Sequence, residues 1–364
     1  MERCNPIQLE FQSSCRIMLQ YNITIKENFL LSSIMTHRSK PSATLLFFIA
    51  TILFSGSSSA GLKVVVSILP VHSLVSGLMS GVGKPYLLLK GNQSPHTMTL
   101  KPSDVRAMNQ ADLLVWVGDS LESPLSSVIE NDNKPDRVIS LLDIPNMHFL
   151  PVRHDLDWAS HNHEEDHDHE KHHDHKEHHD HAKHLESDHG DETDNHIWLS
   201  PENARSMVRH LAKVLIDLDP GHSEKYQSNL KRMLQQIDQS EMAFKTTVSA
   251  VKDRPFIVFH DAYHYLEDHF SLKAVGSVSI SPERQSGAKH IHELRQKIRR
   301  LEAICVFSEP QFQPKLVDTL IDGTDASAGI LDPLGMALTP GEEAYFQLMN
   351  GLAENLASCL GGVK

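Results

Sequence analysis

The chain has 364 residues, of which 40% are hydrophobic, and a formal net charge of −13 at pH 7. At roughly 100–200 residues per domain, this length predicts two domains, and the composition is that of a globular protein rather than a disordered or membrane-embedded one. The body of the chain has no basic patch, which argues against nucleic acid as a partner. The acidity is concentrated between His161 and Asp194, where 13 acidic residues stand against 3 lysines, together with 12 of the 25 histidines.

A targeting segment is predicted near the amino terminus. Leu45–Phe54 is an apolar run of ten residues, too short for a membrane-spanning helix, which needs about 20. Basic residues precede this run and small residues ending at Ala60 follow it, the layout of a secretory signal peptide, with an N-terminal core strand as the alternative. Met35 stands directly before the basic stretch, so we expect residues 1–34 to be an over-extended start and residues 35–60 the signal peptide. A cut near Ala60, with no cysteine beside it for a lipid anchor, predicts a soluble periplasmic protein that does not span the membrane.

Removal of this segment leaves Cys305 and Cys359 as the cysteines of the mature chain. An even pair in an oxidising compartment predicts a disulfide, with two separate buried thiols as the alternative.

Short β-branched apolar runs alternate with helical patterns after the predicted cut, which indicates parallel βαβ units. In the first half we expect strands at 63–68, 86–90, 112–118 and 137–142, and helices at about 71–79 and from Ser103 onward. In the second half we expect strands at 255–261, 272–280 and 303–310, and a helix at about 289–301.

Two segments separate these halves. Residues 154–194 have no apolar periodicity and predict a disordered, solvated insertion. Pro201 opens a helix, and residues 222–252 form an unusually long helical pattern that would span about 45 Å. We therefore predict an α/β fold of two lobes with central parallel sheets, one at 61–221 and one at 253–364, joined by this single long helix.

Three histidines outside the insertion stand at the ends of apolar runs. His96 follows the second predicted strand, His196 begins the segment HIWL, and His260 ends the run FIVFH. In open α/β sheets ligands bind beyond the carboxyl ends of the strands, and neutral imidazoles suit Zn²⁺. One such histidine is more typical of a structural role, but three together predict a metal site. Histidine ligands favour zinc over manganese, with Asp332 or a water molecule as the expected fourth ligand.

Other polar residues near this predicted site have less definite roles. Glu309, near a strand end, is as consistent with a helix start as with a metal ligand. His264, four residues after His260, is expected to lie behind the ligands or at the surface, and His72 at the surface.

The motifs SPHTMTLKPSD, NHIWLSPENA, FHDAYHYLE, CVFSEPQF and LDPLG occur in this order. Together they resemble the zinc-specific solute-binding proteins of metal ABC transporters, the ZnuA type of the cluster A-I (cluster 9) family. The resemblance covers essentially the whole mature chain. It implies two α/β lobes, a rigid connecting helix, and metal held in the cleft between the lobes.

Residue by residue, the resemblance implies that His96 and His196 are first-lobe ligands and His260 the second-lobe ligand. Asp332 matches an aspartate that completes the site in some members. Manganese-type relatives tend to have glutamate where this chain has His260, which supports zinc. Some zinc-type members have an acidic residue where this chain has Pro95, so the fourth ligand is left between Asp332 and water.

The insertion resembles the charged, histidine-rich loop of many zinc-type members, and the placement of Cys305 and Cys359 resembles a disulfide of some members. We expect the insertion to be an auxiliary, metal-collecting or level-sensing segment, with a solvated linker as the alternative. Its histidines are His161, His163, His167, His169, His172, His173, His175, His178, His179, His181, His184 and His189.

The predicted function is that of a monomeric periplasmic protein, not an enzyme, that delivers Zn²⁺ to an inner-membrane ABC permease with its ATPase. The alternatives are a manganese or iron carrier of the same fold, a secreted zinc hydrolase, and a histidine-rich metal store or adhesin. Outside the histidine-rich insertion, the sequence lacks the HExxH motif that a hydrolase of this kind would use.

Overall fold

The computed structural model describes residues 61–91, 93–131, 135–153, 193–279, 288–311 and 315–362. The expected over-extended start, the signal peptide with its cut, and the twelve histidines of the insertion lie outside the described residues. Within the described part of the chain, no helix is long and apolar enough to cross a membrane.

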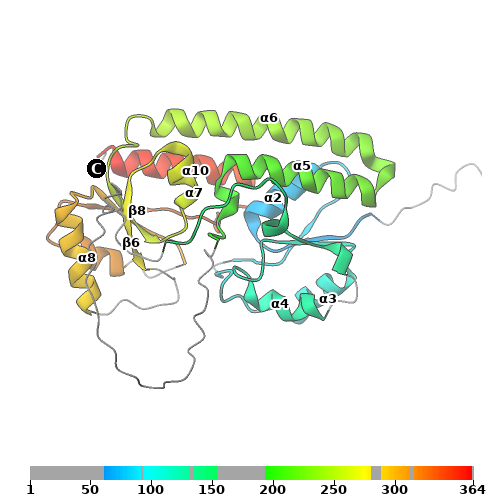
Figure 1. Cartoon of the computed structure of the whole chain (residues 1–364), viewed down its shortest axis with the longest axis horizontal. Helices are drawn as coiled ribbons and strands as arrows, with labels where there is room; N and C mark the ends of the chain where they lie inside the picture. The colour runs from blue at the N-terminus through cyan, green and yellow to red at the C-terminus, as the bar shows by residue number, and fades with distance from the viewer. Residues whose placement is uncertain are drawn as a thin grey trace, which may run out of the picture. The chain divides into compact units, whose positions relative to one another are not determined.

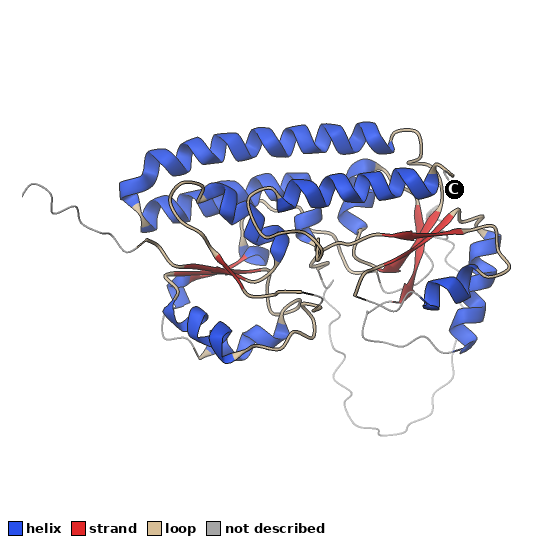
Figure 2. Ribbon diagram, turned by 180° about the vertical axis from the view of Figure 1, so that it is seen from behind, coloured by secondary structure: helices blue, strands red, loops and turns tan. Residues whose placement is uncertain are grey.

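Two parallel four-stranded sheets, each with helices on both faces, organise the described residues (Figures 1 and 2). The strand order is β2-β1-β3-β4 in the first sheet and β6-β5-β7-β8 in the second. Both sheets thus have the same topology, and the predicted pair of α/β lobes is confirmed. The strands are β1 (Val64–Val66), β2 (Tyr86–Leu87), β3 (Leu113–Trp116), β4 (Val138–Ser140), β5 (Phe256–His260), β6 (Ala274–Ser279), β7 (Cys305–Ser308) and β8 (Ser327–Ile330).

The central strands are built from continuous apolar runs. Every residue of β1, β3, β5 and β7 is buried, as expected for parallel strands covered on both faces. The helices are α2 (Leu69–Leu78), α3 (Pro102–Gln110), α4 (Ser123–Glu130), α5 (Pro201–Leu218), α6 (Ser223–Val248), α7 (His264–Phe270), α8 (Ala288–Arg300), α9 (Lys315–Ile321) and α10 (Ala344–Leu360).

The long helix α6 lies alongside α5 and α10 (Figure 1). Its buried apolar residues recur at spacings of four and seven, so they form one stripe on the helix; they are Tyr226, Met233, Ile237, Phe244 and Val248. The helix α10, near the carboxyl end of the chain, packs on α6, on β8 and on α2 of the first lobe. Because of this packing, α10 contacts both lobes and supports α6.

One expectation for the first lobe is wrong. His72 is not at the surface but only 6% exposed, because α2 is buried on nearly all of its faces. The imidazole Nε2 lies 3.1 Å from the carbonyl oxygen of Pro85, which satisfies the buried ring.

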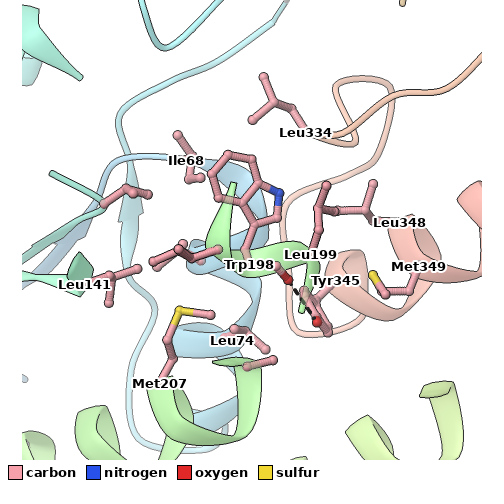
Figure 3. Packing of buried hydrophobic residues seen from close by; sticks show 14 of the residues in the cluster. Ile68, Leu74, Leu141, Trp198, Leu199, Met207, Leu334, Tyr345, Leu348 and Met349 are labelled. Atoms are coloured by element: carbon pink, nitrogen blue, oxygen red, sulfur yellow. Dashed lines mark hydrogen bonds between the residues drawn. The ribbon is translucent and has the colours of Figure 1, made fainter. Parts of the chain in front are cut away.

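A single buried apolar cluster draws on both lobes and on the helices between them. Figure 3 shows part of it, where Ile68 of the first lobe and Leu334 of the second lie near the buried indole of Trp198, and Leu74 lies beside Met207. The expected disulfide between Cys305 and Cys359 is present and joins β7 to the last turn of α10.

Candidate metal centre

Each of the three histidines is positioned by the end of a regular element. His260 is the last residue of β5, and His196 directly precedes the short 3₁₀ turn Ile197–Leu199 that leads into α5. Ser200 caps α5 by accepting a hydrogen bond from the backbone N–H of the third helical residue at 3.2 Å. His96 lies in the loop that follows β2, so two of the histidines follow the carboxyl ends of parallel strands, as the sequence pattern predicts.

The structure brings these three imidazoles together. One potential ligand atom from each of His96, His196 and His260 lies within 4.8 Å of the others. The Nε2 atoms of His196 and His260 are 3.3 Å apart. Tetrahedral zinc with bonds of 2.0–2.1 Å requires nitrogen ligands about 3.3–3.4 Å apart, so this pair already has the spacing of a zinc site. The rings of His196 and His260 are buried, whereas His96 is partly exposed.

A carboxylate holds the far nitrogen of each buried ring. Asp194 Oδ1 lies 2.7 Å from His196 Nδ1 and accepts the backbone N–H of the same residue at 2.9 Å. Glu309 Oε1 contacts His260 Nδ1, and Glu309 is 2% exposed. Ionised carboxylates only accept hydrogen bonds, so each Nδ1 carries the proton and each Nε2 faces the centre. This carboxylate–histidine arrangement is the usual support of a metal ligand.

The two carboxylates also change the proton affinities of the site. Burial lowers the pKa of His260, but the charge and hydrogen bond of Glu309 outweigh burial, so the pKa lies above its usual value. Burial favours the neutral form of Asp194, yet the charge and hydrogen bonds of His196 hold its carboxyl pKa below the usual value. At this site a carboxylate thus favours the charged form of His260, and a histidine favours the charged form of Asp194.

The walls of the pocket around the imidazoles are rigid. The pocket is lined by the three histidines together with Ser94, Pro95, Trp198, Gln311, Pro333 and Leu334. The indole Nε1 of Trp198 donates to the carbonyl oxygen of Pro333 at 2.8 Å, and the hydroxyl of Tyr345 donates to the carbonyl of Trp198 at 3.1 Å (Figure 3). The first bond joins the His196 segment to the LDPLG loop of the other lobe, and the second joins the same segment to α10.

Asp332 is placed differently from the three histidines. Its carboxylate accepts backbone hydrogen bonds of 3.0, 2.9 and 2.7 Å from Leu334, Gly335 and Met336, so it shapes its own loop. The group of clustered ligand atoms among the described residues does not include it. His264 is half-buried behind the site, where burial lowers its pKa.

The sequence interpretation missed Asp194. We assigned it to the end of the insertion, 154–194, because its surroundings in the sequence are uniformly charged. In the structure Asp194 is 5% exposed and its carboxylate accepts hydrogen bonds from His196, so its assignment to a solvated insertion was wrong. The spacing D-x-H immediately before an apolar segment is the signal that identifies it.

Known structures show the same fold. A structure described as "Crystal structure of ZnuA" superposes with a TM-score of 0.65 at 20% identity, covering 82% of this chain and 99% of that one. A zinc-bound ZnuA with residues 138–173 deleted gives a TM-score of 0.63 at 21% identity, covering 82% and 98%. The fold is that of a two-lobed α/β protein, and its candidate site is a cluster of three histidines.

Sequence comparison identifies the family. The high-affinity zinc uptake system protein ZnuA of Brucella abortus (strain 2308) is 45% identical over 316 residues, which are 84% of this chain and 95% of that protein. The protein of the same name from Yersinia pestis is 34% identical over 330 residues, 90% and 100% of the two chains. The model of the family described as zinc-uptake complex component A, periplasmic (ZnuA) matches residues 64–359, and the chain belongs to this family.

Proposed function

We propose that this protein captures Zn²⁺ with His96, His196 and His260 and delivers it to an inner-membrane ABC permease with its ATPase. The observation that carries the proposal is the 3.3 Å spacing of two Nε2 atoms within a cluster of three imidazoles. Membership in the periplasmic zinc-uptake family and relatives named for high-affinity zinc uptake support it. The protein acts by binding and release in the periplasm, without catalysis.

The ligand set accounts for the choice of metal. Three imidazole nitrogens suit Zn²⁺, whereas Mn²⁺ prefers more oxygen ligands. The carboxylates of Asp194 and Glu309 hold the two buried rings with Nε2 directed inward, so little reorientation is needed when the ion arrives. Because the Asp332 carboxylate is engaged by three backbone N–H groups, we assign the fourth position to a water molecule.

The remaining parts of the proposal concern processing and the insertion. The mature chain begins after Ala60 and acts as a monomer. The twelve histidines between His161 and His189 form auxiliary, weaker metal sites, because their irregular spacing among acidic residues offers many ligand combinations and no single geometry. One tight site per chain therefore remains when this segment is shortened.

Substitution of the ligands tests the proposal. His96→Ala, His196→Ala and His260→Ala should each weaken zinc binding by more than the roughly 10–100-fold that loss of an outer partner costs. His222→Ala is the matched control, since this imidazole is 48% exposed and hydrogen-bonds Asp219, three residues earlier on the same turn. Competition titration against a chromophoric chelator gives the affinities, and Mn²⁺ added as competitor should not displace Zn²⁺. Wild-type affinity in all three variants, or displacement by Mn²⁺, would overturn the proposal.

A further inference from the structure

The two short segments that flank residues 154–192 in the sequence pair with each other. We call this pair of segments the neck and define it as Leu150–Arg153 together with Thr193–Asp194. Pro151 and Thr193 form an antiparallel bridge, and the backbone N–H of Asp194 donates to the carbonyl oxygen of Leu150 at 2.8 Å. The two strands of the neck therefore hold each other.

One side chain of α7 binds both strands of the neck. The hydroxyl of Tyr265 accepts the backbone N–H of Leu150 at 3.2 Å and donates to the carbonyl oxygen of Asp194 at 2.8 Å. Tyr265 is 1% exposed, so these bonds form in a dry environment where polar groups need partners. The neck is thereby seated on a helix of the second lobe.

Arg153, the last described residue of the first neck strand, makes a second and charged connection. Its guanidinium binds Asp261 through Nε at 2.8 Å and through Nη2, and binds Glu267 at 2.7 Å and 3.1 Å. The exposed fractions of the three side chains are 19%, 11% and 8%. A planar guanidinium with two bidentate partners fixes both distance and orientation.

The contact between the neck and the second lobe involves segments that are close to proposed metal ligands on both sides. Asp261 directly follows His260 in the chain, and Asp194 of the neck binds His196 through Oδ1. The contact of the neck with Asp261 and α7 therefore links the chain segment next to His196 to the one next to His260, and the Nε2 atoms of these two histidines are 3.3 Å apart.

We propose that Arg153 is a positioning residue of the metal centre: by clamping the neck to Asp261 and Glu267, it holds His196 and His260 at metal-binding spacing. The inference rests on the proposed zinc function, and it assigns the required geometry to the neck rather than to residues 155–191. The effect of Arg153 on the ligands is transmitted through the Asp194 and Asp261 segments.

The test compares two arginines that each bind two carboxylates. Arg205 of α5 pairs with Asp238 and Glu241 of α6 instead of with Asp261 and Glu267, so Arg205→Met is the matched control for Arg153→Met. Zinc affinity is measured by chelator competition, and the absorption spectrum of bound Co²⁺ reports ligand geometry. Arg153→Met should lose about 10–100-fold in zinc affinity, as for other outer partners of metal ligands, with an altered Co²⁺ spectrum. Arg205→Met should retain both.

Two further variants keep the proposal falsifiable if Arg153→Met does not fold. Tyr265→Phe removes both hydrogen bonds of the Tyr265 hydroxyl to the neck while keeping the ring, and should weaken zinc binding in the same direction. Replacement of residues 155–191 by a short glycine–serine linker retains the neck and should leave the tight site intact. Equal losses in Arg153→Met and Arg205→Met, or unchanged binding in both neck variants, would overturn the inference. Failure of the wild-type protein to bind zinc would instead overturn the proposed function.

Discussion

Glu309→Gln removes the charge that supports His260 and keeps the shape of the side chain. Glu309 is 2% exposed, its Oε1 contacts His260 Nδ1, and its Oε2 accepts the amide N–H of Gln311 at 2.8 Å. A glutamine whose oxygen serves His260 turns its NH₂ group toward Gln311, whose amide must then turn over so that its own unpaired Oε1 accepts that group. The contact with His260 is kept but its charge is lost, and we expect a loss within the roughly 10–100-fold range typical of outer partners of metal ligands. That corresponds to about 1.4–2.7 kcal/mol.

The pH dependence gives this substitution a second signature. In the wild-type protein Glu309 raises the pKa of His260 against the effect of burial, and a protonated imidazole cannot bind metal. Zinc affinity should therefore fall as the pH decreases through a value above 6.5, the ordinary histidine pKa. In Glu309→Gln burial dominates, the pKa of His260 drops, and the decline should occur at lower pH. The variant should thus bind more weakly at pH 8 and depend less on pH between 6 and 8.

Chelator competition titrations from pH 5.5 to 8 measure both signatures. Glu241→Gln is the matched control, because Glu241 binds His269 at 2.7 Å in a carboxylate–histidine pair that is not part of the cluster of potential ligands. It should leave the affinity and its pH profile unchanged. An unaltered affinity at pH 8 in Glu309→Gln, or a decline that moves to higher pH, would refute the reasoning.

Three predictions concern stability. Replacement of Cys305 and Cys359 by alanine opens a loop of 54 residues and should lower the free energy of unfolding by about 4 kcal/mol in the chain-entropy model, measured by urea denaturation; a loss below about 1 kcal/mol would contradict it. Asn229→Ala leaves two carbonyl groups at the end of α2 without their 2.7 and 2.8 Å donor and should cost about 1–3 kcal/mol in the same assay, whereas no change would show that these bonds are dispensable. Asp332→Asn should destabilise its loop by about 1–2 kcal/mol while zinc affinity changes less than about tenfold. A larger loss of affinity at unchanged stability would identify Asp332 as a ligand.

The sequence allowed correct prediction of features that depend on local pattern. Strands such as Val64–Val66 and Phe256–His260 are continuous apolar runs because both faces are covered. The helix Ser223–Val248 has a regular apolar stripe. His260 could be identified as a candidate ligand because a polar residue at the end of a buried strand is conspicuous.

Other features depend on long-range contacts and leave no local pattern. Ser327–Ile330 is an edge strand whose residues are alternately half-buried and exposed, so no apolar run in the sequence marks it. Arg153 finds Asp261 and Glu267 at sequence separations of 108 and 114, which neither composition nor periodicity reveals. Asp194 follows a run of charged residues in the sequence, and composition could not distinguish it from them, although it is buried in the structure.

The most direct test of the central claim is the zinc stoichiometry of the protein with residues 155–191 replaced by a short linker. Chelator competition should detect one tight Zn²⁺ site per chain in this protein. The same protein carrying His96→Ala, His196→Ala and His260→Ala should have none. A tight site that persists without these three imidazoles, or one that disappears with the insertion alone, would contradict the account.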